Sequence, residues 1–119
     1  MMRPSANLLD VQVYLGVVDF RKGINGLSAL VQAELELDPF SERLFVFRNR
    51  RQDAVKILYW EKSGFCLWHK RLEKETFRWP KLNNSDLAVI TGEQLNWLLD
   101  GYDINAMRPH KKLYFSSII

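Results

Sequence analysis

The hydrophobic residues of this chain follow two periods, and the change falls near residue 44. Between residues 23 and 36 apolar side chains recur three and four positions apart, at Ile24, Leu27, Leu30, Val31 and Leu35. That spacing predicts a helix from about Gly23 to Glu36 with one buried stripe. Asp19 lies ahead of it, where a capping carboxylate is favoured, and Asp38-Pro39 should stop it, because a residue before proline is pushed out of the α region.

Alternating, β-branched and aromatic segments predict strands on both sides of this helix. Val11, Val13 and Leu15 alternate with polar or amphipathic residues and indicate a short strand that ends at Gly16. After the helix, strands are expected at residues 44–48, 54–61, 65–73, 76–79 and 87–90. Short turns between strands favour antiparallel hairpins. We therefore expect an antiparallel meander of three to five strands, with the helix on one face and a polar opposite face.

A second, shorter helix is predicted near the C-terminus. Thr91 and Gln94 have the spacing of a capping box, and Gly101 is placed to end the helix. Its buried stripe should consist of Leu95, Trp97, Leu98 and Leu99. The predicted fold class is α+β in a single domain spanning residues 1–119. The tail from 102 to 119 is apolar at Leu113–Ile119, and we expect it to dock on the domain or on a partner.

The composition is that of an ordinary soluble globular protein, with 47% hydrophobic and 26% charged residues among 119. No apolar run approaches the roughly 20 residues that cross a bilayer, and residues 1–10 do not resemble a secretory signal. The single Cys66 can form no internal disulfide. These features predict a cytoplasmic protein without a membrane partner.

Positive charge is concentrated in the middle of the chain. Residues 43–81 carry 11 Lys or Arg and 4 Asp or Glu, whereas the rest carries 6 and 10, so the net charge of +3 hides a divided molecule. Clustered cations indicate contact with phosphates; the alternative is a solvated charged face. The candidate nucleic-acid-binding residues are Arg21, Lys22, Arg48, Arg50, Arg51, Lys56, Lys70, Arg71 and Arg78.

Several of these candidates have a purely structural alternative. Lys56 and Lys70 share strand faces with apolar residues, over which long side chains can lie. Arg21 and Lys22 stand at a helix start, where they oppose the helix dipole unless an anion binds or Asp19 pairs with one of them. The aromatic residues of the strands favour core positions over base stacking.

The sequence offers no catalytic constellation. His69 and His110 lack the partners of a metal site, and no serine has a nucleophile signature. Asp19, Asp53 and Asp86 lie on different predicted elements, with nothing to fix their convergence. We therefore expect no enzymatic activity, no metal and no cofactor.

Several motifs occur together in one order: residues 18–27, 44–51 (LFVFRNRR), 56–60 (KILYW), 64–68 (GFCLW), 70–73 (KRLE) and 77–80 (FRWP). In these motifs the chain resembles the small proteins encoded by the second open reading frame of the insertion-sequence family numbered sixty-six, and the match spans about residues 11–101. The resemblance departs at Ala54, where relatives often carry a basic residue, and at Glu61-Lys62-Ser63.

The resemblance implies a bacterial mobile element in which a separate, larger transposase carries the chemistry and this protein assists. Together with the basic residues, it favours a non-catalytic accessory protein that binds DNA. The alternative is an adaptor that docks on the transposase, or on another protein of the element, without touching DNA. Self-association is also plausible, because a short meander leaves strand edges to cover.

Overall fold

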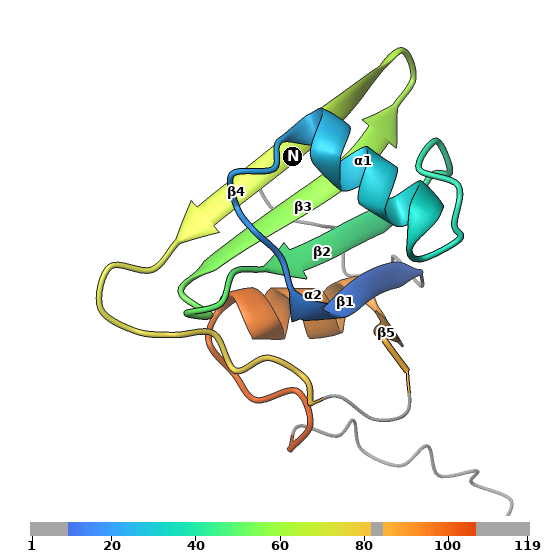
Figure 1. Cartoon of the computed structure of the whole chain (residues 1–119). Helices are drawn as coiled ribbons and strands as arrows, with labels where there is room; N and C mark the ends of the chain where they lie inside the picture. Colours follow the sequence, from blue (N-terminus) through green and yellow to red (C-terminus); the bar gives the residue numbers. More distant parts are fainter. Residues whose placement is uncertain (1–9, 82–84, 107–119) are drawn as a thin grey trace, which may run out of the picture.

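The computed structural model describes residues 10–81 and 85–106, which form one five-stranded sheet and two helices. In chain order the elements are β1 (Val11–Val17), α1 (Ile24–Ala33), β2 (Leu44–Arg48), β3 (Ala54–Glu61), β4 (Gly64–Arg71), β5 (Leu87–Ile90) and α2 (Gly92–Leu99). The strand order across the sheet is β4-β3-β2-β1-β5 (Figure 1). The predicted α+β class is confirmed.

The sheet is mixed, not a pure antiparallel meander. Strands β2, β3 and β4 form the expected antiparallel series, and β5 is antiparallel to β1. Strand β1, however, runs parallel to β2, with Val11 beside Leu44 and Val17 beside Arg48. A parallel pair needs a crossover connection, which α1 supplies. The carboxyl ends of β1 and β2 consequently meet at the same end of the sheet, close to the start of α1.

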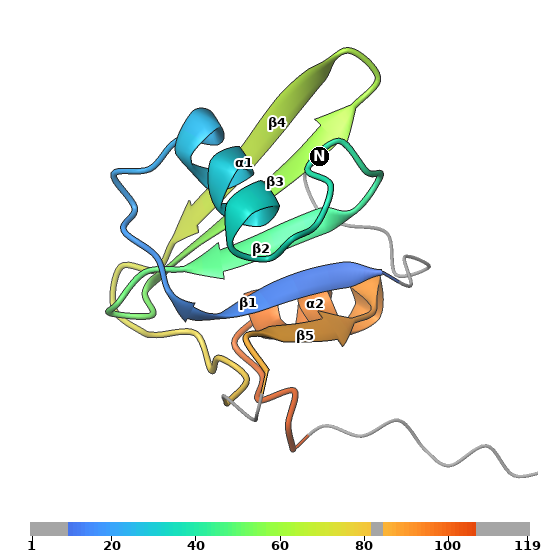
Figure 2. The ribbon, with the colours of Figure 1, turned by 45° about the vertical axis from the view of Figure 1, so that its right-hand side comes forward.

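Both faces of the sheet are covered, so the prediction of a polar face was wrong. Helix α1 packs on one face, over Phe45, Phe47 and Leu58. Helix α2 packs on the other, against the side chains that alternate with them, such as Val46 and Ile57 (Figures 1 and 2). Strand β2 is buried at four successive positions from Leu44 to Phe47, which is the pattern of a strand covered on both sides.

Helix α1 is shorter than the helix that the apolar spacing predicted from about Gly23 to Glu36. Gly23 is the N-cap and provides no side-chain hydrogen bond, so Asp19 does not cap the helix. The helix ends at Ala33, and Glu36, with φ 54°, redirects the chain before Pro39 is reached. Strand β1 likewise continues through Gly16 to Val17.

Residues 72–81 follow β4 as an extended segment without strand pairing, which corrects the strand predicted at 76–79. Phe77 and Trp79 are buried in the core between the sheet and α2. The Phe77 amide donates to the Gln52 carbonyl (2.7 Å), and the Trp79 indole donates to the Tyr14 carbonyl (3.0 Å). The alternating buried side chains Phe77 and Trp79 therefore anchor this segment across the end of the sheet.

The start and end of α2 agree with the sequence. Thr91 and Gln94 form both hydrogen bonds of the predicted capping box, and Gly101 follows the helix with φ 93°. The buried residues of the helix include Leu95, Leu98 and Leu99, whereas Trp97 is only partly buried. The predicted docking segment Leu113–Ile119 lies outside the described residues.

Candidate nucleic-acid interface

The turn between β2 and β3 presents two arginines from a well-braced loop. Asn49 shapes this turn: its side-chain amide donates to Asp53, and its side-chain oxygen accepts the Ala54 amide (3.1 Å). Gln52 adopts a positive φ of 58°. Arg50 and Arg51 are exposed at the tip, and neither has a carboxylate within ion-pairing distance among the described residues.

These two arginines line a cleft of about 530 Å³ between the β2–β3 turn and the chain leaving β1. The cleft lies at the carboxyl ends of the two parallel strands, where open α/β sheets commonly bind ligands. Its lining also includes Asp19 and Phe20, and its other members are Val17, Val18 and Asn49. Arg50 and Arg51 outnumber the one carboxylate, so the cleft favours an anion.

Arg48 lies beneath this turn and is largely occupied by the backbone. Its guanidinium donates to the carbonyls of Leu15 (3.3 Å) and Asn49 (3.4 Å), and so ties the ends of β1 and β2 together. Its Nε is buried and has no hydrogen-bond partner among residues 10–81 and 85–106. Burial, and secondarily the nearby Arg50, lower the pKa of Arg48. Arg48 therefore acts mainly by holding the backbone of the site in place, and little of its guanidinium is available to bind a ligand.

The start of α1 contributes one free cation and one paired cation. Arg21 donates to the Asp19 carboxylate at 2.6 Å, as the structural alternative anticipated, and these hydrogen bonds lower the pKa of Asp19 to about 2. Lys22 is exposed, and no ion pair of its ammonium group occurs within the described part of the chain. The uncapped amides at the helix start add partial positive charge beside it.

Lys56 and Lys70 are not placed to meet a polyanion. Lys56 is only 8% exposed; its ammonium donates to the carbonyls of Phe20 (2.9 Å) and Lys22 (2.8 Å) and lies 4.9 Å from the centre of the Phe20 ring. Lys70 donates to the Leu99 carbonyl at the end of α2 (3.1 Å). Both lysines hold other elements against the sheet, so their ammonium groups are already engaged by backbone carbonyls.

The extended segment brings further cations to the same end of the sheet. Arg78 is exposed between the two anchors Phe77 and Trp79. Arg71, at the end of β4, is exposed but pairs with Glu73 at 3.3 Å. Sequence reasoning passed over Lys74, which is exposed on this segment, and Asn49, whose place in a polar turn was the available signal.

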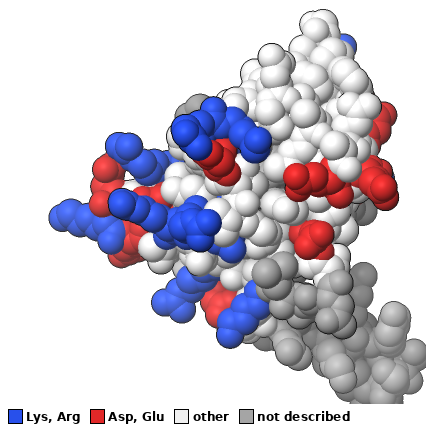
Figure 3. Space-filling model, viewed as in Figure 1, with Lys and Arg blue, Asp and Glu red and all other residues white. Residues whose placement is uncertain are grey.

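Charge is divided between the two ends of the sheet. Figure 3 shows Lys and Arg gathered at the left, over the β2–β3 turn, the start of α1 and the segment after β4, with acidic residues mixed among them. We call this the basic end; its exposed cations that form no ion pair with a described carboxylate are Lys22, Arg50, Arg51 and Arg78, together with Lys74 and Lys81 of the segment after β4. The right of the same view carries acidic residues.

The described residues contain no group of three or more His, Cys, Asp or Glu arranged to hold a metal ion. In particular, Asp19 is bonded to Arg21 and Asp53 to Asn49. No helix in residues 10–81 or 85–106 has the length and apolar character needed to span a membrane. The arrangement is suited to binding an anionic ligand by charge.

Comparison of the chain with known proteins identifies its family. The family model described as "IS66 Orf2 like protein" matches residues 9–109. Two proteins of Sinorhizobium fredii strain NGR234, both described as uncharacterized, are similar to the chain. Protein y4hO is 37% identical over 86% of this chain and 88% of its own length, and y4jC is 39% identical over 87% and 86%. No solved structure matches. The chain therefore belongs to the IS66 Orf2-like family of accessory proteins of transposition.

Proposed function

We propose that this accessory protein binds the phosphate backbone of DNA through its basic end and thereby assists a separate transposase, without catalysing a reaction itself. The observation that carries the proposal is the convergence of Lys22, Arg50, Arg51 and Arg78 from three separate segments upon one end of the sheet. The proposal places the protein in the bacterial cytoplasm, where the DNA of the element lies.

The chemistry of these groups suits backbone contact. Arginine binds phosphate oxygens in a bidentate manner, and Arg50 and Arg51 flank a cleft at a rigid turn. Such contacts position a protein on DNA without selecting a sequence. We therefore expect binding that depends strongly on salt and weakly on sequence.

The expected salt dependence follows from the number of cations that contact phosphate. If Lys22, Arg50, Arg51 and Arg78 each neutralise one phosphate, the logarithm of the binding constant falls with the logarithm of salt concentration with a slope of about −3.6. Affinity then falls about 150-fold between roughly 50 and 200 mM salt. Replacing Arg50 and Arg51 by alanine reduces the slope to about −1.8 and that loss to about 12-fold.

Fluorescence anisotropy with a labelled duplex from an end of the element measures both slopes. The matched control is the double variant Arg43→Ala/Lys62→Ala, which removes the same charge from the opposite end of the sheet. Arg43 pairs there with Asp10 (2.8 Å) and Lys62 is exposed. Absent or salt-independent binding, or equal loss in both double variants, would rule out the basic end as the DNA contact.

A second candidate function is a protein adaptor that does not touch DNA. The acidic residues among the cations of the basic end, including Asp19 and Glu73 with their arginine partners, favour it, since they reduce the net field. An adaptor would retain its partner in a pull-down after nuclease treatment, and it would show no duplex binding at low salt.

A further inference from the structure

The end of the sheet opposite the basic end carries a partly exposed aromatic cluster. Phe40, from the loop between α1 and β2, meets Trp60 of β3 and Phe65 of β4. The ring centres lie 5.1 Å apart for Phe40 and Trp60, 5.2 Å for Phe40 and Phe65, and 5.0 Å for Trp60 and Phe65. Phe65 packs against the core under α1, whereas Phe40 and Trp60 belong to neither core. Phe40 is 55% exposed.

A cluster of large aromatic side chains that stays partly exposed is typical of a protein-binding surface. Aromatic residues are enriched in the energetically dominant centres of interfaces, and burial of such rings away from water is favourable. Clefts flank the cluster: one of about 270 Å³ is lined by Tyr59 and Trp60 together with the charged residues Glu42, Arg43, Glu61 and Lys62. A second, of about 320 Å³, is lined by Phe65 and by the turn that joins β3 and β4.

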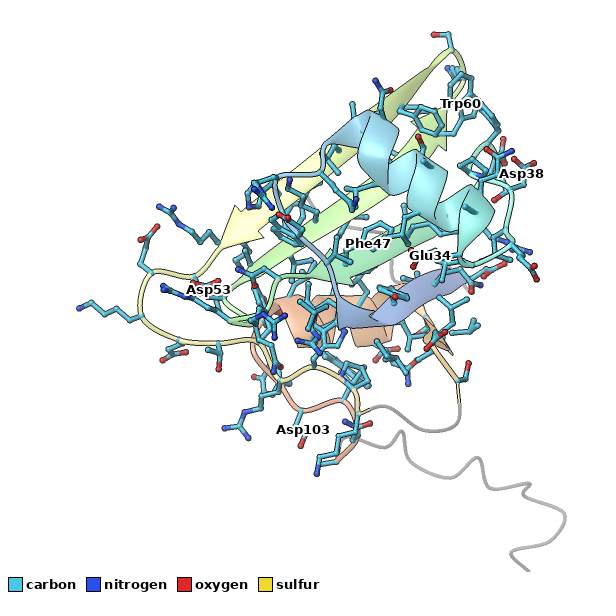
Figure 4. All side chains as sticks on the ribbon, viewed as in Figure 1. Glu34, Asp38, Phe47, Asp53, Trp60 and Asp103 are labelled. Atoms are coloured by element: carbon cyan, nitrogen blue, oxygen red, sulfur yellow. The ribbon has the colours of Figure 1, made fainter. Side chains whose placement is uncertain are left out.

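The surroundings of this cluster carry more acidic than basic side chains. Figure 4 shows Trp60 and Asp38 at the same end of the molecule, far from Asp53. Glu42 and Glu61 share a cleft with Trp60, as do Lys62 and Arg43, the latter paired with Asp10. Glu34, Glu36 and Asp38 are exposed beyond the C-terminus of α1, where the helix dipole disfavours negative charge, and that helix has no basic residue in its last turn. An arrangement that opposes the dipole is stabilised when a cation binds there.

We propose that this acidic aromatic surface docks a segment of another protein whose apolar side chains are flanked by Lys or Arg. A symmetric dimer through the same surface is disfavoured, because it would bring the acidic residues of two copies together. The apolar anchors of the partner would cover Phe40 and Trp60, and its cations would meet the carboxylates around them. The surface lies at the opposite end of the sheet from the DNA contact proposed above, so both ligands can be held at once.

The test uses the full-length protein and labelled overlapping peptides that span the transposase encoded by the same element. The choice of this probe rests on the proposed function. Peptides that combine apolar residues with Lys or Arg should bind. Phe40→Ser and Trp60→Ala should each weaken binding at least about tenfold. Tyr102→Ser is the matched control, because Tyr102 is an aromatic residue with the same 55% exposure, placed beyond α2; it should leave affinity unchanged.

A second pair of variants tests the charge. Glu42→Gln/Glu61→Gln should weaken peptide binding and its salt dependence, whereas Glu73→Gln/Glu75→Gln, on the segment after β4, should not. DNA binding is measured on the same proteins: its retention in Phe40→Ser separates this surface from the basic end. The inference is overturned if no transposase peptide binds, if the bound peptides lack cations, or if Phe40→Ser binds as tightly as wild type. It is also overturned if the free chain is a dimer that Phe40→Ser dissociates.

Discussion

Substitution of Lys56 tests most directly whether a basic residue of the central strands stabilises the fold or contacts DNA. The substitution Lys56→Met keeps the length and apolar stem of the side chain and removes the ammonium group. That group donates to the carbonyls of Phe20 and Lys22 and so holds the β1–α1 connection over β3. Removing it leaves two carbonyls without their donor at a side chain that is 8% exposed.

The expected loss of stability follows from these contacts. Two hydrogen bonds to a charged donor contribute about 3 kcal/mol or more, and the contact with the Phe20 ring adds about 1 kcal/mol. Relief of the buried charge returns about 1–2 kcal/mol. We expect a net loss of about 2–3 kcal/mol, which lowers Tm by roughly 10 °C for a domain of this size.

Urea unfolding followed by tryptophan fluorescence measures this loss as a shift in midpoint at constant slope. Lys74→Met, at an exposed lysine, is the control and should change stability by less than about 0.5 kcal/mol. A Lys56→Met protein of wild-type stability, with a DNA salt slope reduced by about 0.9, would refute the reasoning, because that lysine would then face a phosphate.

Three further substitutions have clear expectations. Asp19→Asn should strengthen DNA binding in the anisotropy titration by freeing Arg21. The pKa of Asp19 is lowered to about 2, so its contribution to stability is present above pH 4 and lost as pH falls through 2; urea midpoints of variant and wild type should converge over that range. Thr91→Ala removes the capping hydroxyl that accepts a hydrogen bond from the backbone amide of Gln94, and it should lower the free energy of unfolding by about 1 kcal/mol in the same assay. Gly101→Ala should cost about 1 kcal/mol or more, since φ is 93° there, and an unchanged midpoint would show that the turn relaxes freely.

Local sequence patterns predicted the helices and strands well, because the formation of these elements depends mainly on residues that are close in the sequence. The capping box at Thr91 and the alternation in β1 both rest on contacts or periodicity within a few positions. The parallel pairing of β1 with β2 depends instead on where α1 crosses the sheet, which no local pattern encodes. Phe77 and Trp79 alternate as strand residues do, yet their partners are Gln52 and Tyr14, far away in the sequence.

The candidate site divides in the same way. The exposure of Arg50 and Arg51 was predictable, because a polar turn between strands lies at the surface. Lys56 was not, because its role depends on two carbonyls contributed more than thirty residues earlier in the chain. Whether Arg21 pairs with Asp19 or is available for an anion was decided only by the structure, in which the two side chains form an ion pair. The sequence therefore indicates which residues are charged, while tertiary contacts decide which of those charges are available.

The opposite charges at the two ends of the sheet act on the protein before it touches anything. Helix α1 adds its own dipole in the same direction, with Lys22 near its positive end and Glu34 at its negative end. A molecule polarised in this way experiences a torque in the field of a polyanion and rotates during diffusional approach. With the proposed DNA contact, the protein would arrive already oriented, with its arginines leading and its aromatic surface turned outward, so that a larger fraction of encounters is productive.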